Sequence, residues 1–260
     1  MNWLNSVAGF GVGLMVGITG VGGGALMTPI LVLLFGVAPA SAVGTDLWFA
    51  AITKLVGGTV HHRKGMVDWQ VVRRLCLGSL PAALATLLWL HVTGSAQTKH
   101  GLILVALGAV LLLTAAAVVF KRQMQAIGQA LRSTAPERFK RAQPLLTVVA
   151  GALLGVLVTL TSVGAGALGT VMLVYLYPFR MTPARLVGTD IVHAIPLTLV
   201  AGAGHLAMGN VEFGLLGGLL LGSIPGILLG STLASRVPER ALRMAIAVLL
   251  CAVGFKLMLS

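Results

Sequence analysis

Long apolar runs recur along the whole chain and constrain its fold more than any other feature. A helix needs roughly 20 apolar residues to cross the hydrocarbon core of a bilayer. Stretches of that length predict membrane-spanning helices at 42–60, 70–90, 102–120, 184–204, 213–234 and 241–259. Only 9% of the residues are charged, against about 25% in soluble domains. The pattern therefore predicts an all-α, polytopic membrane protein.

Two further hydrophobic stretches, 4–36 and 145–177, are longer than one crossing requires. Each is interrupted by glycines, in TGVGGGAL at 19–26 and in TSVGAGAL at 161–168. Irregular backbone at membrane depth is tolerated only where it is buried in protein or lines a cavity. We therefore expect two helical hairpins, each broken at its glycine motif and each entering and leaving the membrane on one side. Glycines that serve close helix packing are the alternative.

The chain also repeats itself. The recurring blocks are TGVGGGAL (19–26) with TSVGAGAL (161–168), VGTD (43–46 with 187–190), and GSLPAAL (78–84) with GSIPGIL (222–228). The first pair is offset by 142 residues and the others by 144, so order and spacing are preserved. This indicates a duplication. We expect repeat 1 at 1–120, a basic cytoplasmic linker at 121–143 and repeat 2 at 144–260.

The loop charges predict how the repeats are oriented. If neither glycine hairpin crosses, 15 of the 18 Lys and Arg residues lie on one face, and Lys99 lies on the other. Those 15 are Arg63, Lys64, Arg73, Arg74, Lys121, Arg122, Arg132, Arg138, Lys140, Arg141, Arg180, Arg185, Arg236, Arg240 and Arg243. If both stretches crossed once, the split would be 10 against six. Lys and Arg mark the cytoplasmic side, so the hairpins are favoured. Three crossings per repeat then make the two repeats inverted.

The net charge of +12 is explained by these loops, and no nucleic-acid binding is expected. Cys76 and Cys251 lie inside predicted spans, without C-x-x-C or Cys/His spacing, so we expect packing residues and no metal site. No cofactor is expected. The first hydrophobic stretch lacks a basic leader and is expected to be retained.

The glycine motifs are the candidate substrate site. Half-helices that begin near Gly24 and Gly166 would aim free backbone N–H groups and their positive dipole ends at one place, which suits an anion. Lys54 lies near the middle of its span, where a charge is costly unless it faces water or a partner. It is either an anion ligand or a side chain that snorkels to the surface. The candidate substrate-binding residues are Thr19, Gly22, Gly24, Thr45, Lys54, Thr161, Ser162, Gly164, Gly166 and Thr189.

Three titratable residues form a candidate proton relay. Asp46 and Asp190 end the two VGTD motifs, and His193 lies one turn beyond Asp190. Carboxylates within spans usually face a cavity, although an Asp near a helix start also stabilises the helix dipole. His193 is either a packing residue or a titrating group. Both alternatives stay open at this point.

The paired glycine motifs, each followed by a proline and VGTD, resemble the TauE/SafE family of sulfite exporters over essentially the whole chain. The resemblance implies transport of sulfite, sulfoacetate or related organosulfonates across the bacterial cytoplasmic membrane. By motif position, Gly22, Gly24, Thr45 and Asp46 pair with Gly164, Gly166, Thr189 and Asp190. Ser162 and Ala165 replace Gly20 and Gly23 of the first motif, so the second loop should be stiffer.

The prediction is a secondary active exporter with proton coupling and its site between the repeats near the bilayer midplane, with the lipid bilayer as its surroundings. The alternative is an importer or a channel for thiosulfate or another small anion. A homodimer remains open. An intramembrane enzyme is not expected, because a protease dyad needs its carboxylates close together and Asp46 and Asp190 belong to different repeats.

Overall fold

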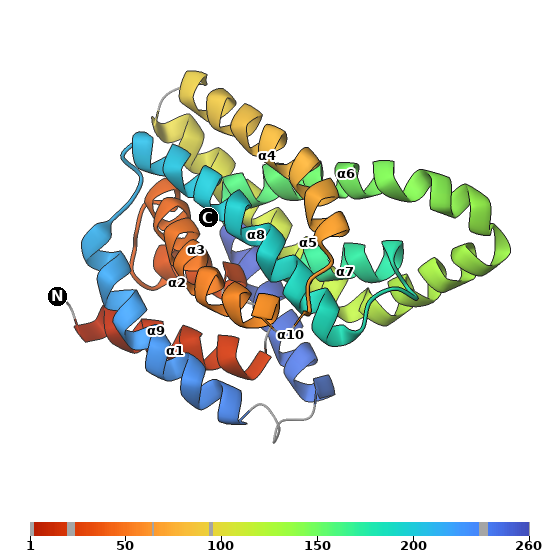
Figure 1. The fold of residues 1–260 in the computed structure, drawn as a ribbon. Coiled ribbons are helices and arrows are strands. Elements are labelled where there is room, and N and C mark those ends of the chain that lie inside the picture. The colour runs from red at the N-terminus through yellow and green to blue at the C-terminus, as the bar shows by residue number, and fades with distance from the viewer. Residues whose placement is uncertain (1–2, 20–23, 64, 94–95, 234–238, 260) are drawn as a thin grey trace.

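A computed structural model describes residues 3–19, 24–63, 65–93, 96–233 and 239–259, and these residues are almost entirely helical (Figure 1). The helices are α1 (Trp3–Thr19), α2 (Gly24–Leu33), α3 (Pro39–Arg63), α4 (Trp69–Val92), α5 (Ala96–Thr134), α6 (Pro136–Thr161), α7 (Ala167–Leu176), α8 (Pro183–Ala207), α9 (Phe213–Leu233) and α10 (Glu239–Met258). No strand occurs in these segments. The predicted all-α class is confirmed.

Both long hydrophobic stretches are divided where their glycine motifs lie. α1 ends at Thr19 and α2 begins at Gly24, while α6 ends at Thr161 and α7 begins at Ala167. α2 and α7 have ten residues each, which is about 15 Å of helix, or half of a hydrocarbon core about 30 Å thick. Each is therefore about half as long as a helix that spans the membrane.

By length and composition, α4, α5, α6, α8 and α9 are each long and apolar enough to cross a membrane, as expected of an integral membrane protein. α3 contains the predicted span 42–60 and carries Asp46 and Lys54, and it is not among these five candidates. The predicted span 241–259 corresponds to α10. The apolar part of this helix, Met244–Met258, is shorter than the five candidate spans.

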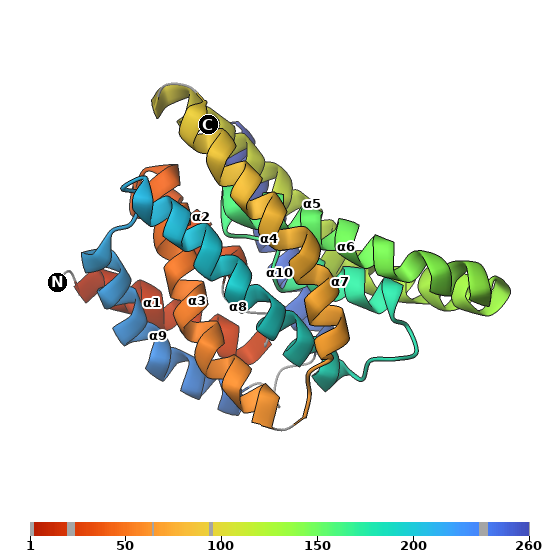
Figure 2. The same ribbon diagram turned by 45° about the horizontal axis from the view of Figure 1, so that its top comes forward.

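α5 is longer than its predicted span 102–120. Its 39 residues extend about 58 Å, and α6 begins two residues after α5 ends. The segment 121–143, predicted as a linker, is thus a helical hairpin. In both views it projects away from the other helices (Figures 1 and 2).

The two halves of the chain exchange helices. α1 packs along α9, and α4 packs along α6, so each of these pairs joins one helix from each half. α3 and α8 pack against each other in the middle of the bundle, and α5 packs on α10 (Figure 1). As a result, the hairpin helices of one half are held by a spanning helix of the other half.

Glycines permit the closest of these contacts. Gly151 and Gly155 of α6 face the backbone carbonyls of Leu75 and Ser79 on α4, and a Cβ at either glycine would overlap these oxygens. α1 packs on α9 through glycines in the same way. Such small-residue contacts let helix backbones approach in a membrane, where apolar side chains gain little by avoiding lipid.

Candidate functional site

The break between α6 and α7 lies at the centre of the candidate site. Ser162 adopts the left-handed conformation with φ 60°, and Gly164 and Gly166 have φ 122° and 138°. Side chains rarely adopt the last two conformations, so the glycines are required there. The Thr161 hydroxyl accepts a hydrogen bond from the amide of Val163 at 3.1 Å and fixes the start of the turn.

The backbone amides at the start of α7 lie in the break that carries the second glycine motif. Within the described chain, the N–H groups of residues 164–168 make no hydrogen bond. Free amides at a helix N-terminus, together with the helix dipole, attract anions. The matching loop of the first half includes Gly22 and falls in 20–23, outside the described residues; Thr19 ends α1 and Gly24 begins α2 on either side of it.

Lys54 reaches this loop from α3. Its ammonium Nζ donates a hydrogen bond of 3.1 Å to the backbone carbonyl of Ala165, and the residue is only 8% exposed. The side chain therefore points into the protein and does not snorkel to the surface. Lys54 also interacts electrostatically with Asp46 and Asp190. One cation thus connects the two predicted relay carboxylates with the broken helix.

Asp46 is fully buried on α3 and accepts a hydrogen bond of 2.5 Å from the Thr28 hydroxyl of the half-helix α2. Its other oxygen, Oδ1, has no partner of acceptable geometry among the described residues, and neither has Ser162 Oγ. Ser162 is nonetheless close enough to interact with Asp46. Asp46 therefore lies between the half-helix α2 and the start of the α6–α7 break, and among the described residues one of its oxygens has no hydrogen-bond partner.

Asp190 occupies the equivalent place on α8. It is 3% exposed, and its Oδ1 lies against the Cα of Gly169 on the half-helix α7, where a Cβ would overlap it. This oxygen also lacks a hydrogen-bond partner in the described part of the chain. Each VGTD carboxylate therefore packs on the half-helix of its own half. Lys54 supplies a nearby positive charge to both.

His193 is paired with a residue that the sequence did not single out. His193 Nε2 lies 3.0 Å from the Ser79 hydroxyl of α4, and both residues are completely buried. His193 Nδ1 has no hydrogen-bond partner within the residues described. Ser79 belongs to the repeated block GSLPAAL, and that recurrence was its signal in the sequence. The pair joins a spanning helix of the first half to the helix that carries Asp190.

Among the described residues, the hydroxyls of the two VGTD threonines form no hydrogen bond with Lys54, Asp46, Asp190 or His193; their partners lie elsewhere. Thr45 Oγ1 accepts from the amide of Glu212 at 3.0 Å, and Thr189 Oγ1 accepts from the amide of Asp68 at 2.9 Å. Asp68 and Glu212 directly precede α4 and α9. Each of these two predicted substrate-binding threonines therefore binds the residue that precedes a helix of the other half.

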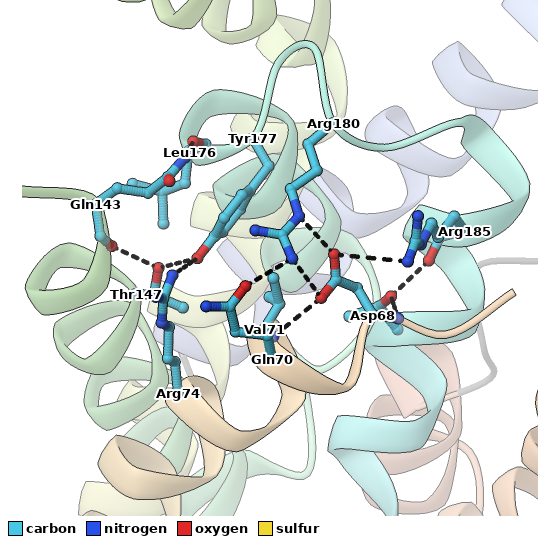
Figure 3. Close-up of polar contacts among 11 residues, drawn as sticks. Asp68, Gln70, Val71, Arg74, Gln143, Thr147, Leu176, Tyr177, Arg180 and Arg185 are labelled. Carbon is cyan, nitrogen blue, oxygen red and sulfur yellow. Dashed lines mark hydrogen bonds and ion pairs between the residues drawn. The ribbon is translucent and has the colours of Figure 1, made fainter. Parts of the chain in front are cut away.

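Asp68 is the centre of a second polar network (Figure 3). Its carboxylate caps α4 and accepts two hydrogen bonds from the Arg180 guanidinium, at 2.7 and 2.9 Å, with Arg185 at 4.0 Å. Arg180 also lies over the ring of Tyr177, whose hydroxyl is 2.8 Å from that of Thr147. The network joins the start of α4 to the turn between α7 and α8. It was not predicted from the sequence.

No cluster of three or more His, Cys, Asp or Glu side chains suited to a metal ion occurs in the described segments. What the site offers is a lysine, free helix-end amides and a serine hydroxyl as donors, beside two carboxylates and a histidine that can carry protons. Such a set can bind an oxyanion and exchange a proton next to it.

Comparison with known proteins identifies the family of the chain. The model of the family described as sulfite exporter TauE/SafE matches residues 6–257. The probable membrane transporter protein YjnA of Bacillus subtilis is 39% identical and is matched over 96% of each chain. The probable membrane transporter protein YdhB of the same organism is 27% identical, over 91% of this chain and 92% of its own. No solved structure matches the chain. The chain belongs to the TauE/SafE family of membrane transporters.

Proposed function

We propose that this protein exports sulfite, sulfoacetate or a related organosulfonate across the bacterial cytoplasmic membrane, as a secondary transporter coupled to protons. The observation that carries the proposal is the buried Lys54, hydrogen-bonded to the carbonyl of Ala165 in the break between α6 and α7. A buried cation at a broken helix is the chemistry expected of a mid-membrane anion site.

The donors around the break suit an oxyanion. The amides of residues 164–168 and the Ser162 hydroxyl have no hydrogen-bond partner among the described residues, so they can donate to a substrate, and Lys54 supplies a full positive charge. The oxygens of sulfite or a sulfonate accept several hydrogen bonds at once. Bonds from an ammonium group to such an oxygen are stronger than bonds to a neutral carbonyl. The substrate would therefore displace the Ala165 carbonyl from Lys54.

Proton coupling is supported by the acids that flank Lys54. Asp46 and Asp190 are buried, each has one oxygen without a partner in the described chain, and both interact with Lys54. When an anion binds to Lys54, the positive charge of Lys54 is shared with the anion. Less of that charge is then left to balance the negative charges of Asp46 and Asp190. Uptake of a proton by Asp46, Asp190 or His193 would restore the balance of charge. Substrate and proton would then move together.

Inverted repeats at 1–120 and 144–260, joined by the segment 121–143, provide the two-sided access such a transporter needs. The ion pair between Asp68 and Arg180 supports this topology. If the stretch 145–177 crossed the membrane, Asp68 and Arg180 would lie on opposite faces. Their contact supports hairpins that do not cross, with 61–74 and 178–185 together on the cytoplasmic side.

Flux measurements in proteoliposomes test the proposal. We expect labelled sulfite or sulfoacetate to accumulate by counterflow and its flux to depend on an imposed pH gradient. Thiosulfate should be tested in parallel, because an importer or channel for thiosulfate is the alternative. Flux without counterflow would indicate a channel. Counterflow that is indifferent to the pH gradient would overturn proton coupling while leaving the anion site intact.

A further inference from the structure

The α5–α6 hairpin carries an apolar stripe that is longer than the membrane core. Six of the seven exposed large apolar residues described on α5 follow one face at helical spacing; they are Leu102, Val105, Leu113, Phe120, Ile127 and Leu131, each between 37% and 52% exposed. From Leu102 to Leu131 the stripe extends about 44 Å, against about 30 Å of hydrocarbon. Its last part must therefore lie in the interfacial layer or require a tilted helix.

Basic residues continue the equivalent stripe on α6. Leu145, Val149 and Val156 are 68%, 46% and 37% exposed and lie on one helix face. Arg138 and Arg141 precede Leu145 by seven and four residues, so they lie on that same face, and both are exposed. Arg138 is about 10 Å and Arg141 about 6 Å along the axis from Leu145. Both arginines thus continue the line of exposed apolar residues toward the start of α6.

The other charges near the tip of the hairpin, at residues 132–140, are arranged differently. Lys140 lies on another face of α6 and pairs with Glu137 at 3.4 Å. Arg132, on α5, donates to the backbone carbonyl of Pro136 at 3.1 Å. Arg138 and Arg141 form no ion pair within the described residues. These two arginines can therefore bind a partner outside the chain. They lie on the same face of α6 as the exposed apolar residues Leu145, Val149 and Val156.

We propose that the α5–α6 hairpin lies in the cytoplasmic interface of the membrane and that Arg138 and Arg141 bind the phosphate groups of anionic phospholipids. Arginine binds phosphate through two parallel hydrogen bonds, which gives it geometric specificity. The apolar stripe holds the hairpin against the acyl chains, and the arginines hold the headgroups. The lipid would thereby restrain the hairpin, on which the C-terminal end of α7 packs through Tyr175 and Gly128.

Native mass spectrometry of the full-length protein in detergent, with phosphatidylglycerol and phosphatidylcholine added as competitors, tests the proposal. Detergent removes any dependence on membrane orientation. We expect the wild type to retain phosphatidylglycerol preferentially. Each single variant, Arg138→Gln or Arg141→Gln, should lower the phosphatidylglycerol preference about fivefold, equivalent to about 1 kcal/mol for a basic residue near an anionic surface. The double variant should lower it roughly 25-fold.

Lys140→Gln is the matched control, since it removes the same charge from the same helix on a different face. It should change the preference less than twofold. Arg138→Lys with Arg141→Lys keeps the charge but loses the paired hydrogen bonds, so it should retain only part of the phosphatidylglycerol preference. An unchanged preference in the double Gln variant would overturn the proposal. An equal loss in Lys140→Gln would also overturn it, because the attraction would then come from diffuse charge.

Discussion

Lys54 of α3 donates a hydrogen bond to the carbonyl oxygen of Ala165, a residue 111 positions away in the turn between α6 and α7. A neutral carbonyl is a weaker partner for a buried ammonium group than an oxyanion is. Lys54 is thus held in the site by a contact that an anionic substrate can replace. The two carboxylates that interact with it, Asp46 and Asp190, come one from each half.

Replacing Lys54 with Met should retain the fold and weaken substrate binding. Loss of a charge-assisted contact costs about 1.5–3 kcal/mol, roughly 10- to 150-fold in the dissociation constant for sulfite or sulfoacetate. Lys54→Arg should restore binding incompletely, because a planar fork replaces a compact charge. Calorimetry on the purified protein gives these values, and Lys140→Met is the control at an exposed lysine. Unchanged affinity in Lys54→Met would remove this residue from the substrate site.

Replacing Gly166 with Leu should abolish transport without preventing membrane insertion. Gly166 has φ 138°, and a side chain in such a conformation costs about 1–3 kcal/mol while covering the free amides of α7. Gly217 on α9 has open space around its Cα, so Gly217→Leu controls for added bulk. Flux in proteoliposomes and the amount of inserted protein are the two measurements. Wild-type flux in Gly166→Leu would make this glycine a packing residue only.

The elements that the sequence predicted are those with a local physical cause. Apolar runs of sufficient length indicated the helices, and the glycine motif predicted the break between Thr161 and Ala167. The position of Lys54 in the middle of a span left two roles open, an anion ligand or a side chain that snorkels to the surface, and its burial against Ala165 excludes the second. The identity of its partner, a carbonyl 111 residues away, depends on how α3 packs against the second half, which no local pattern encodes.

The same limit applies to the residues that sequence reasoning missed. Ser79 and His193 are 114 positions apart, and Asp68 and Arg180 are 112 apart, so neither pair has a local signature. Thr45 and Thr189 were predicted to bind substrate because they adjoin the acidic residues, yet their hydroxyls accept from backbone amides. The segment 121–143 resembled a linker by its charge, but its Ala, Gln, Leu and Lys content also favours helix.

Asp68 and Arg180 should be energetically coupled. Asp68→Asn keeps a side chain able to cap α4 but removes the charge that Arg180 binds, and Arg180→Gln removes the other partner. We expect each variant to destabilise the protein by about 1–3 kcal/mol, and a double-mutant cycle to give a coupling energy of about 0.5–3 kcal/mol. Unfolding in detergent measures both. Strictly additive losses would show that the ion pair does not link the start of α4 to the α7–α8 turn.

Cysteines at positions 133 and 182 should be labelled from the same, cytoplasmic, side of the membrane. Ser133 lies near the end of α5, and Thr182 caps α8; the α6–α7 hairpin between them is proposed not to cross. Ala38 lies before α3 and is exposed, so a cysteine introduced there by Ala38→Cys should be labelled from the opposite side. A membrane-impermeant thiol reagent applied to intact cells and to inverted vesicles makes the comparison, in a variant without Cys76 and Cys251. Labelling of positions 133 and 182 from opposite sides would contradict the inverted repeats.

Ser79 and His193 allow the packing and relay roles of the histidine to be separated. Ser79→Ala leaves His193 Nε2 buried without its hydrogen-bond partner, which should cost about 1–3 kcal/mol of stability. The first half has Phe49 at the position equivalent to His193. The double variant Ser79→Ala, His193→Phe replaces both polar partners with apolar groups, so it should recover most of that stability.

Transport by this double variant then distinguishes the two roles, because the fold is retained. If His193 takes part in proton transfer, the double variant should bind sulfite with nearly wild-type affinity but lose the dependence of flux on an imposed pH gradient. Thermal unfolding in detergent and flux in proteoliposomes give the two readouts, with Ser223→Ala as the control at the equivalent serine of the second half. Full pH-driven flux in the double variant would establish His193 as a packing residue and would leave the relay to Asp46 and Asp190.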